Sequence, residues 1–177
     1  MKRNSHTPNE FIIKGKICRI KLYDRQLNCV GETIIDVEDV NKCIGYKWCL
    51  TRRENCPYVR TNPTSFYPAM ALHRQVMGIV NISKITLDHI NRDTLANRKS
   101  NLRVCTQSQN GANQKIPKNN RSGYKGVYWH KYKKKWVASV RHNFKLIEIG
   151  LFINKMEAVA AYRNKAKQLF GEFYYQG

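Results

Sequence analysis

The stretch LDHINRDTLANRKSNLRVCTQSQNGAN, residues 87–113, decides how the rest of the chain is interpreted. It begins with the pair Asp88 and His89; Asn101 follows thirteen residues after Asp88, and Asn110 follows nine residues later. A carboxylate and a side-chain amide oxygen are ligands that suit a hard cation. A neutral imidazole can accept a proton from water near pH 7, because its ordinary pKa is about 6.5. The four residue types together indicate a site that combines one metal ion with a general base.

The pattern around these residues predicts a strand, a loop, a strand and a helix. ITLDHI (85–90) and NLRVC (101–105) are the two strands, and the polar run NRDTLANRKS (91–100) connects them. Thr106 is a typical N-cap for a helix over QSQNGANQK (107–115). We therefore expect the Asp-His pair at the end of the first strand. An Asp-His pair alone occurs mostly in turns and caps, so the interpretation depends on the complete set.

Asp88, His89, Asn101 and Asn110, with their spacing and with the sequence NLR at 101–103, resemble the HNH endonuclease family. The resemblance is strongest to the homing-type branch found in phages and introns. The resemblance implies a ββα-metal motif that hydrolyses DNA with one Mg²⁺ or Mn²⁺ ion. It implies that Asp88 and Asn110 bind the metal and that His89 is the general base. Asn101, by the same resemblance, holds the His89 ring through a hydrogen bond. Some relatives carry His at the position of Asn110, and the Asn variant matches the homing branch.

The charge of the chain points to a polyanionic partner. The 177 residues include 32 Lys and Arg but 12 Asp and Glu, a formal net charge of +20. Residues 113–177 carry 14 basic and 3 acidic side chains, whereas residues 1–112 carry 18 and 9. The density of positive charge is thus about twice as high in the C-terminal part, where we expect a nucleic-acid-binding module. Charge alone is also compatible with a ribosomal or basic structural protein.

Other features of the composition indicate the cellular environment of the protein. The sequence has no apolar run of the ~20 residues that a membrane helix needs, and no signal-peptide core. Its six cysteines form no C-x-x-C pair, so we expect free thiols in a reducing cytoplasm, that of the host cell if a phage encodes the chain. The spacings of Cys43, Cys49 and Cys56 do not suit a zinc knuckle.

Residues 121–175 predict three antiparallel strands followed by one helix. GYKGVYWHKYKKKWVASVRHNFKLIEIGLF (123–152) alternates between apolar and polar residues, with turns expected at KYKKK and RHNF. Asn154 is the expected start of the helix. Apolar residues then recur at helical spacing, which would pack the helix on the sheet: Val159, Tyr162, Ala166, Leu169 and Phe170.

This segment resembles the Apetala-two/ethylene-response-factor DNA-binding domain, through GYKGVYW (123–129), WVASVR (136–141), IGLF (149–152) and EAVAAYRNKAKQLFGEF (157–173). The resemblance implies that the sheet lies in the major groove of DNA. The positions expected to face DNA are Arg121, Lys125, Tyr128, His130 and Arg141, with phosphate contacts from Lys131, Lys133, Lys134 and Lys135. Trp129 is expected to stack on sugar or base, and Trp136 to lie in the core. The plant family carries Arg where this chain has Tyr128, His130 and Leu146, so its target sequence does not transfer.

The sequence leaves two possible roles for several residues near the Asp-His pair. His73, in ALHRQVMG (71–78), is either a third metal ligand or a side chain that packs against the motif or contacts a phosphate. Arg98, Lys99 and Arg103 either bind DNA phosphates or belong to a solvated loop.

The expected fold class is α+β, in four parts: a β-rich segment (1–70), the HNH motif (71–115), a linker (116–122) and a DNA-binding domain (123–177). The expected function is metal-dependent cleavage of double-stranded DNA by a monomer that nicks one strand. A non-catalytic DNA-binding regulator is the alternative. A third option is an RNA-binding protein that stacks bases on Tyr124, Tyr128 and Trp129.

Overall fold

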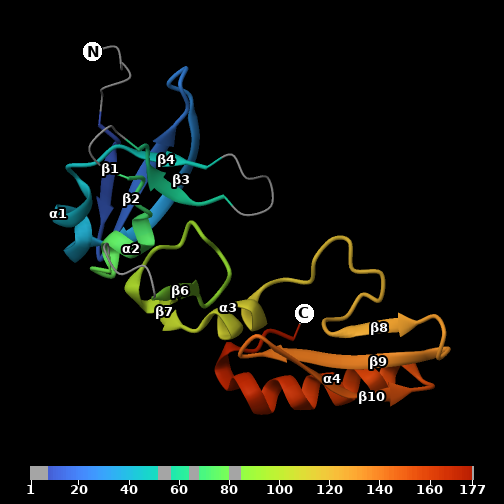
Figure 1. Ribbon diagram of the computed structural model, residues 1–177. Helices are drawn as coiled ribbons and strands as arrows, with labels where there is room; N and C mark the ends of the chain where they lie inside the picture. The colour runs from blue at the N-terminus through green and yellow to red at the C-terminus, as the bar shows by residue number, and fades with distance from the viewer. Residues whose placement is uncertain (1–7, 52–56, 64–67, 80–84, 177) are drawn as a thin grey trace. The chain divides into compact units, whose positions relative to one another are not determined.

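The computed structural model describes residues 8–51, 57–63, 68–79 and 85–176. The chain divides into two compact units, Met1–Val104 and Cys105–Gly177. The described residues form short helices and small antiparallel sheets, which is the α+β class that the sequence predicts (Figure 1).

The N-terminal unit begins with a three-stranded antiparallel meander of β1 (Phe11–Lys14), β2 (Ile17–Tyr23) and β3 (Cys29–Asp36). Gly15, with a φ of 59°, makes the tight turn between β1 and β2. Alternate residues of β2 point into the core and are fully buried: Cys18, Ile20 and Leu22. This burial explains the alternation seen in the sequence.

Short elements continue the N-terminal unit. They are η1 (Val37–Asp39), α1 (Val40–Cys43) and the paired strands β4 (Trp48–Leu50) and β5 (Val59–Thr61). The sequence around TRRENCP (51–57) predicts a polar connection between these two strands, and most of it, 52–56, lies outside the described residues. Trp48 is fully buried, and its indole nitrogen donates to the carbonyl oxygen of Cys43 at 2.9 Å. The meander and this hairpin share one hydrophobic core.

The stretch that carries the Asp-His pair follows. Its elements are α2 (Leu72–Val76), β6 (Thr86–His89), η2 (Lys99–Asn101) and β7 (Leu102–Cys105). Strands β6 and β7 form a two-stranded sheet (Figure 1). The order of strand, loop and strand is therefore the one expected from the sequence.

The C-terminal unit opens with α3 (Gln107–Asn113). Thr106 and Gln109 form a reciprocal capping box, which stabilises this short helix although it contains a glycine. Ala112 of α3 packs in the core of the C-terminal unit, and its carbonyl oxygen accepts from the backbone of Tyr175. The division between the units consequently falls before α3, earlier than the linker-like run 116–122.

The C-terminal sheet consists of β8 (Val127–His130), β9 (Lys135–His142) and β10 (Lys145–Phe152), in the order β10-β9-β8. Helix α4 (Lys155–Phe170) lies along one face of the sheet, and η3 (Gly171–Phe173) follows it (Figure 1). The Asn154 side chain caps α4 by accepting from Met156 N at 2.7 Å. The three strands and the helix agree with the sequence prediction.

None of the helices in the described residues has the length and apolar character needed to cross a membrane. The five described cysteines are free thiols, and Cys56 lies outside the described residues.

Candidate functional site

Asp88 and His89 are the last two residues of β6, and both side chains are buried, with 6% and 4% of their surfaces exposed. The pairing of β6 with β7 holds this end of the strand, and Ile90 N donates to Asn101 O just beyond it at 2.9 Å. A buried polar pair is costly unless its atoms find partners. The partners of these two side chains define the site.

The partner of the His89 ring is Asn97. The His89 Nε2 atom lies 3.1 Å from the Asn97 side-chain oxygen, in a buried contact. The Asn97 amide nitrogen donates to the Thr94 carbonyl oxygen, which fixes the orientation of the amide. Since the Asn97 oxygen can only accept, Nε2 carries the proton. Nδ1 is then the nitrogen that bears the lone pair in the neutral ring.

Asn97 is itself held by β3. Its amide nitrogen donates to the Thr33 hydroxyl oxygen at 2.8 Å, and the Thr33 hydroxyl donates to Leu95 O at 2.7 Å. The backbone of Ile34, next to Thr33, makes two hydrogen bonds to the loop. Ile34 N donates to Leu95 O, and Asn97 N donates to Ile34 O. The loop between β6 and β7 is therefore docked on the first sheet, and Asn97 is only 1% exposed.

Asn101 has a different role from the one expected. Its side-chain oxygen accepts from Asn91 N at 3.0 Å, and its amide nitrogen donates to Ala96 O at 2.7 Å. Both bonds brace the loop between β6 and β7. The predicted hydrogen bond from Asn101 to the His89 ring is replaced by the bond from Asn97, because η2 directs the Asn101 side chain into the loop.

Arg103 of β7 contacts the Asp88 carboxylate. Its Nε and Nη2 atoms lie 3.0 and 2.9 Å from Oδ2 of Asp88, and the Arg103 side chain is 12% exposed. From the sequence, Arg103 was expected either to bind a DNA phosphate or to belong to a solvated loop. The structure gives it the buried carboxylate instead, because neighbouring strands bring the two side chains together.

The pKa values of His89 and of the neighbouring His73 are both lowered, which favours the neutral form of each ring. Burial lowers the pKa of His89, while the Asn97 hydrogen bond and the nearby carboxylates of Asp88 and Asp93 oppose that effect. Burial, followed by the charges of His89 and Arg74, lowers the pKa of His73 to about 4. The ring of His73 packs against the ring of His89, and their centroids are 5.3 Å apart. At neutral pH both imidazoles can serve as neutral groups.

Arg98 and Lys99 are engaged in ion pairs with the acidic turn after β3. Arg98 Nε donates to Asp36 Oδ1 at 2.8 Å, and Lys99 Nζ lies 2.6 Å from Glu38 and 3.0 Å from the buried Asp39. Hydrogen bonds to these two carboxylates raise the pKa of Lys99. Both side chains were expected either to bind phosphate or to be solvated. In the structure, Arg98 joins the loop to the end of β3, and Lys99 joins it to η1.

The donor set for a metal is small in this unit. Among the described residues, no three His, Cys, Asp or Glu side chains are grouped as a metal site would need. A Mg²⁺ site commonly has one or two carboxylates and several waters, so the Asp88 carboxylate fits such an ion. Asn110, the second expected ligand, belongs to α3 of the C-terminal unit. There it lines a concavity of about 450 Å³ that Arg141 also lines.

The sheet of the C-terminal unit has one face covered by α4 and one face that carries polar side chains. Val127, Ala138 and Val140 pack in the core with α4. By strand alternation, the opposite face carries the polar side chains of Tyr128, His130, Lys135 and Arg141. It also carries the buried Val137 of β9 and the exposed Leu146 of β10. This face contains three of the positions expected to face DNA, and Tyr128 is 46% exposed.

Two other expected DNA contacts lie elsewhere. Lys125 donates from Nζ to Ala112 O at 2.8 Å and lies over the Tyr175 ring, so it joins parts of its own unit. Trp129 pairs in register with Trp136, on the face opposite Tyr128, and the two indoles meet edge to face with centroids 5.2 Å apart. Trp136 is partly buried in the core, as predicted.

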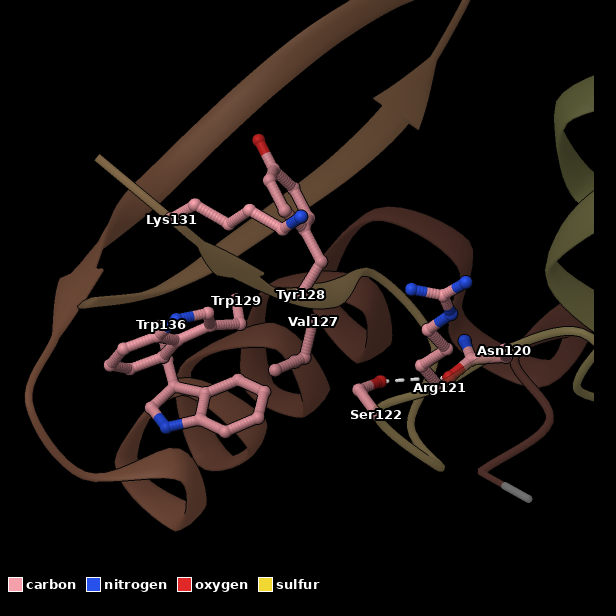
Figure 2. A pocket seen from close by; sticks show the side chains of 8 residues that line it. All are labelled: Asn120, Arg121, Ser122, Val127, Tyr128, Trp129, Lys131 and Trp136. Atoms are coloured by element: carbon pink, nitrogen blue, oxygen red, sulfur yellow. Dashed lines mark hydrogen bonds between the residues drawn. The ribbon is translucent and has the colours of Figure 1, made fainter. Parts of the chain in front are cut away.

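A shallow concavity of about 450 Å³ borders the edge strand β8 (Figure 2). The indoles of Trp129 and Trp136 lie on one side of it in the figure, and Arg121 lies on the other. The dashed line in Figure 2 joins the Ser122 hydroxyl to the Asn120 side-chain oxygen, at 2.8 Å. The lysines of the β8–β9 turn, Lys131, Lys133 and Lys134, are all exposed, and so is Lys135 at the start of β9. Cations and aromatic rings thus gather at this end of the sheet.

Comparison with known proteins shows that the chain is similar to proteins of two viruses. It is 32% identical over 123 residues to Protein 3.8 of Escherichia phage T7, a match that covers 65% of this chain and 97% of that protein. The chain belongs to the Protein 3.8 family. It is also 35% identical over 108 residues to "Uncharacterized HNH endonuclease L560" of Acanthamoeba polyphaga mimivirus, covering 59% of this chain and 55% of that protein. The chain thus spans about half the length of L560. No family model and no solved structure matches the chain.

Sequence reasoning missed Asn97 and Thr33 in this member of the Protein 3.8 family. Asn97 lies within the stretch 87–113, but nothing in the local pattern separates it from the other polar residues of its loop. Its burial depends on Thr33, which is 64 residues away.

Proposed function

We propose that the chain is a metal-dependent HNH endonuclease that hydrolyses phosphodiester bonds in double-stranded DNA. Two findings support the proposal: the match to a viral protein named as an HNH endonuclease, and the buried Asp-His pair at the end of β6. The observation that carries it is the contact between Asn97 and His89, because this contact assigns a specific tautomer to the His89 ring. A histidine that only fills a core needs no such assignment.

His89 is the proposed general base. With Nε2 donating to Asn97, Nδ1 receives a proton from the attacking water. The water oxygen bonds to phosphorus, the bond from phosphorus to the 3′ oxygen breaks, and the 3′ oxyanion takes a proton from a solvent water, so that the products are a 5′-phosphate and a 3′-hydroxyl. The lowered pKa of His89 suits this role, since the ring is unprotonated at neutral pH.

Asp88 is the residue proposed to hold Mg²⁺ or Mn²⁺, with Asn110 remaining a predicted second donor. A bound divalent cation would stabilise negative charge on the phosphate and the leaving oxygen. Arg103 orients the Asp88 carboxylate through its buried ion pair.

The C-terminal unit is proposed to direct cleavage to duplex DNA, in the manner of the Apetala-two/ethylene-response-factor domain that its sequence resembles. Its polar sheet face and the exposed lysines of the β8–β9 turn support this assignment. With one HNH motif in the chain, we propose that a monomer nicks one strand.

The test is a nicking assay on supercoiled plasmid with Mg²⁺ or Mn²⁺. His89→Gln removes the proposed base, and His142→Gln, which alters a histidine of the C-terminal unit, is the matched control. We expect open-circle product from the unaltered protein and from His142→Gln, and none from His89→Gln or after EDTA treatment.

Other outcomes favour other functions. Tight binding to duplex DNA without nicking in either metal would favour a regulator. Preferential binding to single-stranded RNA in a direct competition would favour an RNA-binding protein. Quantitative linear product from a demonstrated monomer in one binding event would contradict the one-strand mechanism.

A further inference from the structure

Three aromatic rings meet at the proposed base. Tyr58 precedes β5, His73 lies in α2 and His89 ends β6, so three separate elements contribute. The ring centroids of His73 and His89 are 5.3 Å apart, at an interplanar angle of 70°. Tyr58 lies 5.8 Å from His73 and 6.1 Å from His89. His89 therefore has rings on one side and the Asn97 amide at Nε2.

The backbone around His73 is held firmly. Its neighbours in α2, Leu72 and Val76, are fully buried. Before the helix, Thr61 N donates to Met70 O at 2.9 Å, and Met70 N donates to the Thr61 hydroxyl at 2.9 Å. These bonds join the start of α2 to β5.

A second contact joins α2 to the strand of the proposed base. Arg74 Nη1 donates to Ile85 O at 2.9 Å, directly before β6. His73 is thus fixed relative to β6, which ends at His89. A ring in this position can restrict the rotation of the His89 side chain.

The ring of His73 is uncharged at the pH at which a histidine base works. Burial is the main cause that lowers its pKa to about 4. A neutral ring can pack edge to face against His89 without charge repulsion. The interplanar angle of 70° between His73 and His89 is therefore consistent with packing of the two rings.

We propose that His73 is a positioning residue, which with Tyr58 holds the imidazole of His89 in the orientation where Nε2 meets Asn97. The inference rests on the proposed function and deepens it, because it names what positions the base. It differs from a role as a third metal ligand, in which the nitrogen atoms of His73 would matter more than its ring. The two roles make opposite predictions for conservative variants.

The experiment compares three substitutions in the full chain. His73→Phe keeps a ring but has no nitrogen, His73→Gln keeps polar atoms but has no ring, and Tyr58→Leu removes the second ring. Nicking rates on plasmid give kcat and KM, and thermal unfolding reports whether each variant folds. Long-range ¹H–¹⁵N NMR spectra of the imidazoles report the tautomer of His89 independently of activity.

We expect His73→Phe to retain kcat within about threefold and to keep His89 in the Nε2–H tautomer. In His73→Gln, kcat should fall by about 10- to 100-fold with KM little changed, because a misplaced base slows the chemical step more than binding. Tyr58→Leu should lower kcat in the same direction. In both of these variants the His89 spectrum should show mixed tautomers.

The reverse order of activity, with His73→Gln active and His73→Phe inactive although folded, would overturn the proposal in favour of a ligand role. An unchanged Nε2–H tautomer in His73→Gln would also overturn it. If the unaltered protein does not nick DNA, the proposed nuclease function fails, while the NMR comparison still decides whether His73 positions the ring.

Discussion

The Asn97 side-chain oxygen lies 3.1 Å from Nε2 of His89, and the amide nitrogen of the same side chain bonds to Thr33 on β3. One residue therefore connects the proposed base to the first sheet of the N-terminal unit. Asn101, which has the expected spacing, braces the loop that carries Asn97. The two asparagines have separable tasks, which can be measured.

Asn97→Ala should lower the nicking rate by about 100-fold, since the base loses the partner that sets its tautomer and orientation. Asn101→Ala is the matched variant, and it should mainly lower the free energy of unfolding, by about 1 to 3 kcal/mol, because two loop backbone groups lose a partner. Nicking rates and urea unfolding curves distinguish the two effects. Equal losses of nicking rate from both variants, with equal stability, would contradict the division of roles.

Arg103→Leu should destabilise the protein by about 3 kcal/mol, because it leaves the buried Asp88 carboxylate without its cationic partner. The double variant Asp88→Leu/Arg103→Leu should be more stable than Arg103→Leu, as it removes the buried charge as well. Chemical denaturation of the three proteins gives the comparison. A double variant less stable than Arg103→Leu would show that the pair stabilises the fold in some other way.

The pKa of His73 predicts a loss of stability in acid. The unfolded chain binds a proton near pH 6.5, whereas folded His73 binds one only near pH 4. Between these values the unfolded state carries more protons, so stability present above pH 6.5 falls as the pH falls, by up to about 3 kcal/mol at pH 4. His73→Phe should flatten this part of the profile of unfolding free energy against pH. An unchanged slope in that variant would assign the effect to other groups.

Changing Lys131, Lys133 and Lys134 together to Gln should reduce the salt dependence of binding to duplex DNA. The slope of log K against log salt should fall in magnitude by roughly 2.7, since each phosphate contact contributes about 0.9. Arg98→Gln/Lys99→Gln is the control, because those cations are paired with Asp36 and Glu38. Fluorescence anisotropy across a salt titration measures both slopes. A larger change in the control than in the lysine variant would place the DNA surface elsewhere.

Gly126→Ala should destabilise the C-terminal unit by about 3 kcal/mol. Gly126 has a φ of 63°, and an added Cβ would collide with the Tyr162 ring and the Ser139 carbonyl oxygen. Gly123→Ala is the matched control, because its φ is also positive but the space around it is open. Thermal unfolding of the two variants should show the larger loss for Gly126→Ala. Similar losses would mean that backbone strain alone accounts for the effect.

The sequence predicted the elements whose signals are local. Apolar alternation in 127–152 and helical spacing in 155–170 each reflect burial on one sheet and one helix, so the C-terminal strands and α4 were found. The Asp-His pair was placed correctly at a strand end because turn-forming residues follow it directly.

The partners of the site were not predictable, because they depend on contacts between distant parts of the chain. Thr33 lies 64 residues from Asn97, and Asp36 lies 62 residues from Arg98. A loop rich in Asn, Arg and Lys has the same composition whether it is solvated or docked on a sheet. The predicted roles of Asn101, Arg98 and Lys99 therefore followed spacing and charge, while their actual partners are set by where the loop packs.

The hydrogen bonds that run from Thr33 through Asn97 to His89 also bear on how such a gene can be exchanged. A recombination event that moved only the codons for 71–115 would transfer the Asp-His pair without the strand against which its loop is docked. The recipient protein would then have to supply a hydroxyl and an open strand edge at the same place. The smallest piece that carries its own support begins with the meander of β1–β3, so an exchange that keeps the site intact should preserve the N-terminal sheet together with the motif.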